Sequence, residues 1–329
     1  MEYHLRMRLS RVVRFTRSSL SVTTTIDEKL ALVPYIFAAS IASLIPISRY
    51  DFVAGIWGLV RYVTQPERRH HSRCAQRLAS RELVSKFDIE VKNLLAFKSY
   101  VRFWIENLAH LVEGPPRTTY NLTMEGSQAV TEWLSTGRGA IIATAHIGNP
   151  DWGGIAISKT ITPLAAIFGP LEPPIFEKWS YHLRTKMGLE TIFLSDSNVT
   201  KQIINKVDEG KLVALTCDFN ISGNALEVEM FSKFIPLASG PATISLRTNT
   251  PVFPGTAFMK PDGGHHLLFG PPIFPKDIHG DSVSHRIKLI TQTIGKELES
   301  QISMASEQWH VVVPLTIKNS LSTSSSPKL

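Results

Sequence analysis

The sequence predicts an α/β protein in which a mixed, largely parallel sheet is flanked by helices, preceded by an N-terminal helical segment that associates with a membrane. Three observations predict this. Short apolar runs alternate with helical patterns from residue 140 onward, which is the order of elements in a parallel sheet. An apolar run of 18 residues, Leu30–Ile47, and a shorter one, Phe52–Val60, lie near the N-terminus. Arginines gather on both sides of these two runs.

The composition is typical of a folded protein with an acidic partner. Of the 329 residues, 43% are hydrophobic and 19% are charged, which excludes intrinsic disorder as the main state. The two cysteines, Cys74 and Cys217, are too few for a disulfide framework or a four-cysteine zinc site. The formal net charge of +7 favours nucleic acid, an anionic membrane or a phosphorylated small molecule as the partner.

Two arginine-rich runs flank the apolar stretch. Residues 1–20 carry five arginines and one glutamate, and residues 61–81 carry six arginines and one glutamate. The apolar stretch is too long, and too far from the first residue, for a signal peptide. A single membrane span would place one arginine run on each side of the bilayer, which the positive-inside rule disfavours. A monotopic or re-entrant hairpin keeps both runs on the cytoplasmic side, where anionic headgroups attract them.

We therefore expect the chain at the cytoplasmic face of the plasma (inner) membrane, monotopic or single-pass, with a buried helix of a soluble fold as the alternative for the apolar stretch. The expected organisation has five parts. They are a basic N-terminal segment (1–29), an apolar membrane-associating segment (30–65), an amphipathic helical region (66–114), an α/β catalytic domain (115–315) and a serine-rich disordered tail (316–329).

The elements follow from the apolar patterns in chain order. Residues 66–110 have a helical period, which the Glu113–Pro116 segment breaks. The run Ala140–Ala145 is apolar almost throughout and predicts a buried strand, whereas Leu226–Phe231 alternates and predicts a half-exposed strand. The remaining predicted strands are 164–168, 191–194, 212–216, 252–259 and 267–271, and the predicted helices are 152–159, 175–187, 199–208, 240–248 and 282–304.

The segment after the first buried strand combines a histidine with a carboxylate. Ala140–Ala145 leads directly into His146-Ile-Gly-Asn-Pro-Asp151, and ligands of α/β sheets bind at the carboxyl ends of the strands. Pro150 suits the first turn of a helix, which places Asp151 within reach of the imidazole. A carboxylate that accepts from one ring nitrogen fixes the tautomer, and the other nitrogen can then remove a proton from a hydroxyl. This spacing also occurs by chance, so the strand-to-helix junction and its glycines, such as Gly148, carry the hypothesis.

Other motifs give weaker signals. The chain contains no G-x-S-x-G nucleophile elbow, no G-x-x-x-x-G-K-S/T phosphate loop and no G-x-G-x-x-G turn, so nucleotide binding is unsupported. The adjacent pairs His70-His71 and His265-His266 are unsuited to joint metal ligation, because neighbours in a strand point to opposite faces. Cys217 ends a predicted buried strand and is expected in the core.

The segment around His146 resembles the His–four residues–Asp motif of glycerolipid and glycolipid acyltransferases. It looks most like the bacterial branch that contains the lipid A late acyltransferases and the phosphatidylinositol mannoside acyltransferases. Three further segments agree in order: the basic run Arg68–Leu78, the helix end Arg184–Gly188, and the stretch Cys217–Ala242 with its Cys-Asp-Phe, acidic strand and small-Gly-Pro helix start. The resemblance covers about residues 45–310. One departure is Ser232, because the family usually has Phe-Gly after the acidic strand.

The resemblance implies acyl transfer from a thioester, acyl-coenzyme A or acyl carrier protein, to a hydroxyl of a membrane glycolipid or lysolipid. The expected partners are this donor, this acceptor and an anionic membrane surface, with no nucleic acid, no metal and no cofactor. By resemblance, the catalytic residues are the base His146, its orienting partner Asp151 and an assisting Glu227. The substrate-binding residues are Arg184 for a phosphate, Gly240 for the oxyanion, and Gly148, Asn149 and Asp218.

Two other functions are compatible with the same residues. A membrane-associated lipid hydrolase, a thioesterase or esterase, would use the histidine and aspartate to activate water instead of a lipid hydroxyl. A non-catalytic lipid-binding protein would have a degenerate site, and the intact His146 and Asp151 argue against it.

Overall fold

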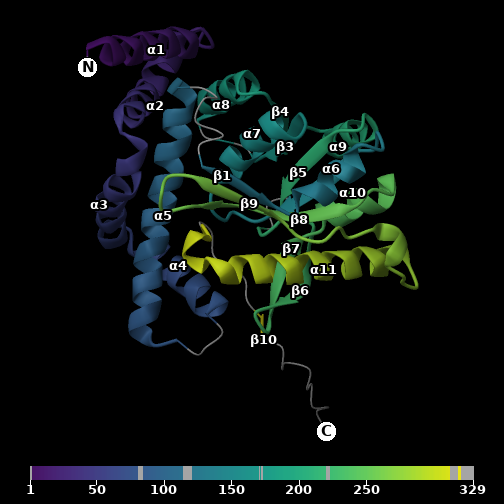
Figure 1. Ribbon diagram of the computed structural model, residues 1–329. Helices are drawn as coiled ribbons and strands as arrows, with labels where there is room; N and C mark the ends of the chain where they lie inside the picture. The colour runs from purple at the N-terminus through teal and green to yellow at the C-terminus, as the bar shows by residue number, and fades with distance from the viewer. Residues whose placement is uncertain are drawn as a thin grey trace.

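A seven-stranded sheet forms the centre of the computed structural model, which describes residues 2–80, 84–113, 121–169, 171, 173–219, 223–311 and 318–319. The strands lie in the order β1-β9-β8-β2-β5-β3-β4 (Figure 1). Their bounds are β1 (Leu122–Glu125), β2 (Ala140–Thr144), β3 (Leu164–Phe168), β4 (Leu189–Phe193), β5 (Leu212–Thr216), β8 (Val252–Met259) and β9 (His265–Phe269). Neighbouring strands pair in parallel except β8 and β9, so the predicted, largely parallel sheet is confirmed.

Helices cover both faces of this sheet, because alternate residues of a strand point to opposite faces. Ile141 and Ala143 of β2 belong to one buried hydrophobic cluster, and Ala140 and Ile142 belong to another. The first cluster contains side chains of α9 (Val199–Asp208), α10 (Gly240–Thr248) and α11 (Val283–Met304), and the second contains side chains of α6 (Ser127–Leu134) and α7 (Pro150–Thr160). Helix α8 (Pro174–Lys186) packs against β4 at the sheet edge.

A small second sheet holds the predicted acidic strand. Strand β6 (Ala225–Met230) pairs antiparallel with β7 (Lys233–Ala238), and β7 pairs with the short β10 (Lys318–Asn319). Val228 is buried and Glu227 is exposed, so the half-exposed strand is confirmed, although it lies outside the main sheet. Strands β1 and β7 and helix α6 were not predicted. Residues 318–319, expected in a disordered tail, form β10, and most of that tail lies outside the described residues.

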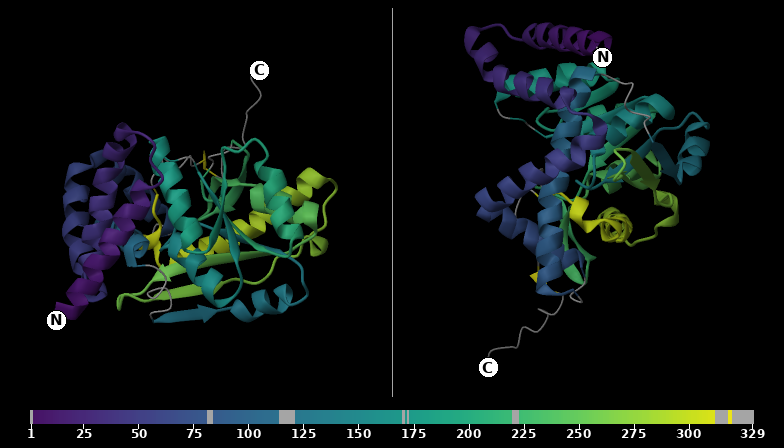
Figure 2. Two further views of the ribbon diagram at one scale, coloured as in Figure 1. Left: turned by 90° about the horizontal axis from the view of Figure 1, so that it is seen from above. Right: turned by 60° about the vertical axis from the view of Figure 1, so that its left-hand side comes forward.

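The N-terminal part is helical, as predicted, and stands beside the sheet (Figures 1 and 2). Its helices are α1 (Glu2–Leu20), α2 (Ile26–Leu44), α3 (Tyr50–Thr64), α4 (Pro66–Ala79) and α5 (Lys86–Glu113). The predicted helical region over 66–110 consists of two helices, α4 and α5, with a break between them. The Ser85 hydroxyl accepts a hydrogen bond from the backbone N–H of Asp88 at 3.1 Å and donates to its carboxylate at 2.7 Å, which starts a new helix.

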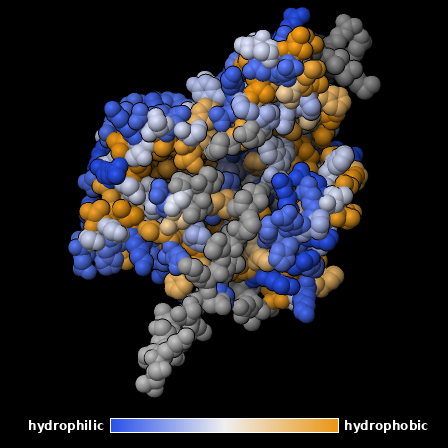
Figure 3. Space-filling view, turned by 180° about the vertical axis from the view of Figure 1, so that it is seen from behind, coloured by the Kyte–Doolittle hydropathy of each residue, from blue (hydrophilic) through white to orange (hydrophobic). Residues whose placement is uncertain are grey.

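Apolar side chains remain exposed along α2, α3 and the start of α5. On the hydropathy-coloured surface in Figure 3, hydrophobic side chains are visible on the side of the N-terminal helices. On α2 and α5 the exposed residues recur three or four apart, as one helix face requires, and on α3 they form a wider stripe. They are Ile26, Leu30, Val33, Phe37, Ile41 and Leu44 on α2, Phe52, Ile56, Trp57, Leu59, Val60 and Val63 on α3, and Phe87, Val91 and Leu95 on α5. We call this set the apolar face.

The helices of the apolar face do not individually have the length and composition of a membrane span. Among the described residues no single helix passes that test, whereas Ile26–Leu44 and Ile47–Thr64 pass it together as a pair bent by 102°. The bend follows Pro46, which precedes a 3-10 turn over Ile47–Arg49. Membrane association therefore stays a prediction, and a pair bent in this way has the length and composition of either a broken span or the predicted re-entrant hairpin.

The β6–β7 hairpin turn predicts a stabilising substitution. Phe231 and Ser232 have φ angles of 53° and 57°, in the left-handed region, and Met230 pairs with Lys233 across this two-residue turn. Because glycine adopts this backbone without strain, Ser232→Gly is expected to raise the free energy of unfolding by about 1 kcal/mol, measured by chemical denaturation. Ser135→Gly is the matched control: Ser135 has φ −63°, and the extra freedom of glycine should lower stability there. Equal effects of both changes would contradict this account.

Candidate functional site

Two neighbouring strand ends bring a histidine and an aspartate together. His146 follows β2, as predicted, and Asp218 follows β5. These strands are paired in parallel, with Thr144 opposite Thr216, so their carboxyl ends meet at one edge of the sheet. Asp218 was expected to bind substrate, but the structure instead places its carboxylate against the His146 ring.

The Asp218 carboxylate holds His146 through both of its oxygens. Oδ1 accepts a hydrogen bond from His146 Nδ1 at 2.7 Å, and Oδ2 accepts one from the backbone N–H of His146 at 2.9 Å. Oδ2 also accepts from Trp309 Nε1 at 3.0 Å. Because Nδ1 donates to Asp218, Nε2 is the ring nitrogen that can accept a proton from a ligand.

Burial and pairing shift the pKa values of His146 and Asp218 in opposite directions. Burial by itself would raise the pKa of Asp218, but attraction to His146 and the three hydrogen bonds hold that pKa below its ordinary value. Burial would also lower the pKa of His146, but Asp218 outweighs it, and the more distant Asp151 contributes in the same direction. The pKa of His146 therefore lies above its ordinary value of 6.5.

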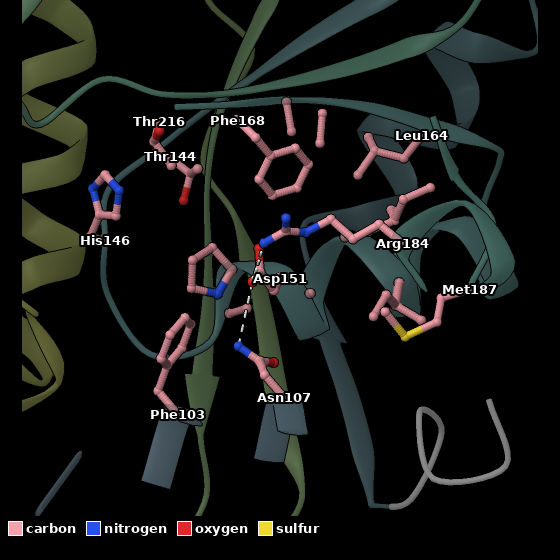
Figure 4. Close-up of a pocket in the computed structure, with 18 of the residues that line it drawn as sticks. Phe103, Asn107, Thr144, His146, Asp151, Leu164, Phe168, Arg184, Met187 and Thr216 are labelled. Atoms are coloured by element: carbon pink, nitrogen blue, oxygen red, sulfur yellow. Dashed lines mark hydrogen bonds and ion pairs between the residues drawn. The ribbon is translucent and has the colours of Figure 1, made fainter. Parts of the chain in front are cut away.

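The structure corrects the expected role of Asp151 as the partner of His146. In the first turn of α7, its Oδ2 accepts instead from Arg184 Nη2 at 3.3 Å and from Asn107 Nδ2 at 3.4 Å (Figure 4). The physical reason is the direction of the helix start. The first turn of α7 carries the Asp151 side chain toward α5 and α8, while the adjacent strand β5 delivers Asp218 to the imidazole.

Arg184 lies in the same cavity as His146 and Asp151. Its guanidinium donates to the Asp151 carboxylate and to the Ser180 hydroxyl, and it stacks over the Phe168 ring with 3.8 Å from Cζ to the ring centroid. These contacts fix the orientation of a planar group that suits a phosphate or carboxylate. The phosphate-binding role stays a prediction.

The cavity has a volume of about 410 Å³ and a largely apolar lining. In Figure 4, His146 lies at one side of it and Leu164 and Met187 at the other, with Asp151 and Arg184 between them. Further lining residues come from α5, the sheet and α7: Tyr100, Phe103, Trp104, Ile142, Ile155, Ala166 and Phe269. An apolar cavity with a few convergent polar groups is the usual form of a small-molecule site.

Asn149, expected to bind substrate, is a structural residue. Its side-chain oxygen accepts from the backbone N–H of Trp152 at 3.0 Å, which caps the start of α7, and its Nδ2 donates to Glu106 at 2.9 Å. Glu106, on α5, also accepts from Arg102 at 2.7 Å and from His265 at 2.9 Å. The side chains of Asn149, Glu106, Arg102 and His265 are all buried, and Asn149 is not among the described residues that line the cavity.

Gly148 is required by the backbone rather than by a substrate. Its φ angle is 64°, and a Cβ atom there would lie 2.0 Å from the carbonyl oxygen of Ala257. Its N–H donates to the carbonyl oxygen of Gln308 at 2.9 Å. Gly148 is not among the described residues that line the cavity, so its expected contact with substrate is not supported.

Glu227 and Gly240 lie away from the cavity lining formed by the described residues. Glu227 is exposed on β6, and Gly240 begins α10 directly after β7. Strands β6 and β7 form their own sheet, and only the end of β7 meets the end of β5, where Ala238 N–H donates to the Cys217 carbonyl at 2.8 Å. The expected assistance of His146 by Glu227 is therefore replaced by Asp218.

Sequence analysis missed Glu106 and Trp309. No local pattern marks either one, because each acts on a residue far along the chain: Glu106 on Asn149 and Trp309 on Asp218.

No group of three or more His, Cys, Asp or Glu side chains suited to a metal ion is present in the part of the chain that the structure describes. His265 and His266 point to opposite faces of β9, toward Glu106 and Thr123 respectively.

Comparisons with known proteins agree on one class of enzyme. The model of a family described as bacterial lipid A biosynthesis acyltransferase matches residues 91–315. The phosphatidylinositol mannoside acyltransferase of Mycolicibacterium smegmatis is 22% identical over 218 residues, which are 66% of this chain and 69% of that protein. The phosphatidylinositol mannoside acyltransferase of Mycobacterium tuberculosis (strain H37Rv) is 21% identical over 223 residues, 67% of this chain and 68% of the relative.

Replacing glycine by alanine is expected to destabilise the protein by different amounts at two positions whose backbones are both left-handed. Gly148 and Gly137 have φ angles of 64° and 78°, but a Cβ at Gly137 would meet nothing within 4 Å. Gly137→Ala is expected to lower the free energy of unfolding by about 1 kcal/mol through backbone strain alone. Gly148→Ala should cost at least roughly 3 kcal/mol, because strain is joined by a clash with the Ala257 carbonyl. Denaturant titration followed by tryptophan fluorescence measures both, and equal losses would refute the packing argument for Gly148.

Proposed function

We propose a reaction for this chain from the premise that it belongs to the bacterial lipid A biosynthesis acyltransferase family, whose model matches more than half of its residues. The resemblance drawn from its motifs is thereby confirmed, and the chain is an acyltransferase. The proposed reaction moves a fatty acyl group from acyl-coenzyme A or acyl carrier protein to a hydroxyl of a membrane glycolipid or lysolipid. The observation that carries it is the His146–Asp218 pair at the polar side of a largely apolar cavity.

In the proposed mechanism, His146 is the general base. Its Nε2 accepts the proton of the acceptor hydroxyl while the hydroxyl oxygen attacks the thioester carbonyl carbon. The imidazolium that forms is stabilised by the Asp218 carboxylate, which bonds Nδ1 at 2.7 Å. When the tetrahedral intermediate collapses, the carbon–sulfur bond breaks and the departing thiolate takes the proton from Nε2. The ester and the free thiol leave, and His146 is neutral again.

The apolar lining supports a site for the acyl chain. With the thioester carbonyl at His146, the chain extends past Asp151 and Arg184 toward Leu164 and Met187 (Figure 4). Burial of each methylene stabilises such a complex by about 0.8 kcal/mol. On this path the chain lies beside the paired Asp151 and Arg184 before it reaches the apolar end of the cavity.

Arg184 is the proposed phosphate-binding residue. It is held by Asp151 and by the Phe168 ring, so little side-chain entropy remains to be lost when a phosphate binds. Acyl donors of both kinds, and phospholipid acceptors, carry phosphates. Asp151 is thereby proposed to act through Arg184 as well as through its charge on His146.

The apolar face is the proposed membrane contact. It presents exposed side chains of α2, α3 and α5, and the arginine-rich helices α1 and α4 lie next to these helices in the chain. Apolar side chains that enter the interface beside arginines that face anionic headgroups are typical of monotopic proteins. We place the chain at the cytoplasmic face of the plasma membrane, where thioester donors are available.

Two aspartate substitutions test the catalytic pair. Asp218→Asn is expected to lower kcat by roughly 1000-fold or more, because the imidazole loses its orienting carboxylate. Asp151→Asn should mainly raise KM, because Arg184 loses its partner.

Only neutral His146 is active, so wild-type kcat/KM should fall as the pH drops through a pKa above 6.5, and Asp218→Asn should move this limb to lower pH.

The assay follows transfer from a radiolabelled acyl thioester to lipid over a range of pH. Near-normal turnover of Asp218→Asn would refute the catalytic pair. Release of free fatty acid at a rate independent of added lipid would instead identify the alternative, a lipid hydrolase that uses the same pair to activate water.

Two substitutions on the apolar face test membrane contact. Phe37 and Ile56 are 65% and 51% exposed, and Phe37→Glu combined with Ile56→Glu should reduce the fraction of protein that floats with vesicles of phosphatidylglycerol and phosphatidylethanolamine by at least about fivefold. Val283→Glu on α11 is the control, because Val283 is 68% exposed but lies outside the apolar face. Equal flotation of the double variant and the control would refute the proposed contact.

A further inference from the structure

The segment that follows α11 packs directly against the catalytic turn. It begins with the 3-10 turn Ser306–Gln308. The Gln308 carbonyl accepts from Gly148 N–H at 2.9 Å, and His310 N–H donates to the His146 carbonyl at 2.7 Å. Trp309 and Ile147 form an antiparallel bridge between these contacts. The segment 306–310 is therefore paired with the backbone of the turn that carries the catalytic histidine.

This segment is itself anchored to the sheet. The Gln308 side chain accepts from the Met259 N–H at 2.8 Å and donates to the Met259 carbonyl at 3.0 Å, at the end of β8. On the other side, Gln76 of α4 donates to the Ser306 carbonyl at 2.9 Å. Ser306 and Gln308 are thus held by α4 and β8, and neither belongs to the catalytic turn. These contacts fix the position of Trp309, which follows Gln308 in the chain.

The Trp309 side chain reaches the buried carboxylate of Asp218. Its ring is 2% exposed and packs beside Phe231, and its Nε1 donates to Asp218 Oδ2 at 3.0 Å. The two other donors to this carboxylate among the described residues both belong to His146. Trp309 is thus the donor that sets the rotation of the carboxylate independently of the histidine.

We propose that Trp309 is a positioning residue, whose indole N–H holds the Asp218 carboxylate in the rotation that presents Oδ1 to His146 Nδ1. The inference rests on the proposed function of the His146–Asp218 pair and deepens it, because the segment after α11 then completes the catalytic site. A hydrogen bond from a neutral donor to a buried carboxylate is charge-assisted, so its removal affects both the orientation and the charge of Asp218.

The charged surroundings of His146 give the sign of the expected effect. Asp218 and Asp151 face it and raise its pKa, and His310, whose pKa burial lowers to about 3, is neutral at ordinary pH. Without the Trp309 donor the Asp218 carboxylate is free to rotate away from His146 Nδ1, so the hydrogen bond that stabilises the imidazolium weakens. The pKa of His146 should therefore fall toward its ordinary value, and the acid limb of activity should move to a lower pH than in the wild type, in the same direction as for Asp218→Asn.

Trp309→Phe removes the donor and keeps an aromatic ring. We expect kcat to fall about 10-fold with little change in KM, and the acid limb of kcat/KM to move to lower pH. Trp133→Phe is the matched control, because Trp133 Nε1 donates to the Gly139 carbonyl at 2.9 Å, away from the cavity. An unchanged pH profile of folded Trp309→Phe would overturn the proposal. Should Trp309→Phe not fold, Trp309→Met, which also lacks the donor, takes its place.

A double-mutant cycle separates positioning from packing. In the Asp218→Ala background, Trp309→Phe should cause no further loss of kcat, because the group through which Trp309 acts is gone. An equal loss in both backgrounds would overturn the proposal, since a packing defect does not depend on Asp218.

An activity-independent readout distinguishes this inference from the proposed function. Diethyl pyrocarbonate modifies neutral imidazole, so the pH dependence of His146 modification, followed by mass spectrometry, reports its titration without any substrate. A shift of the midpoint to lower pH in Trp309→Phe supports the positioning role even if the wild type transfers no acyl group, and then only the proposed function fails. An unchanged midpoint overturns the positioning role even if wild-type transfer is confirmed.

Discussion

A buried glutamate joins the N-terminal helices to the sheet, and the arrangement of the two parts depends on it. Glu106 of α5 accepts hydrogen bonds from Arg102, from Asn149 at the start of α7 and from His265 of β9. Burial opposes its charge, but attraction to His265 and Arg102 and these hydrogen bonds lower its pKa to about 2. A buried carboxylate that lost a partner would cost several kcal/mol, so α5, α7 and β9 are held at fixed distances.

The same constraint determines the shape of the catalytic site. Since Glu106 fixes the cap of α7, the first turn of that helix carries Asp151 into the cavity, where Arg184 pairs with it. The network also continues outward, because Arg102 donates to Asp51 at 2.9 Å at the start of α3. One chain of polar contacts, buried except at Asp51, thus runs from a helix of the apolar face to the turn that holds His146.

The chemistry of the site separates into polar and apolar parts for reasons of sheet geometry. Parallel strands deliver polar side chains at their carboxyl ends, and there β2 and β5 supply His146 and Asp218. The walls of the cavity, by contrast, come from strand interiors and helix faces, where side chains such as Ile142 and Ile155 are apolar because they also form the core. A reactive carbonyl and an acyl chain need these two environments side by side.

The sequence by itself determined the elements whose signals are local. The apolar runs and helical periods of residues 140–304 predict most strands and helices there, and the strand end at His146 follows directly from the run before it. The apolar and basic character of the N-terminal part is likewise local. Sequence analysis did not predict the break before α5, although its cap is also local, since Ser85 and Asp88 are three residues apart.

Only the tertiary structure decided which groups act together. The partner of His146 is Asp218, 72 residues away, because β2 and β5 are neighbours in the sheet although they are not consecutive in the chain. The alternation of β6 predicted an exposed strand but not its place in a second sheet, which removes Glu227 from the site. Trp309 gave no signal at all, since its contact with Asp218 spans 91 residues. Hydrogen bonds between distant side chains depend on strand order and helix docking, which local periodicity does not specify.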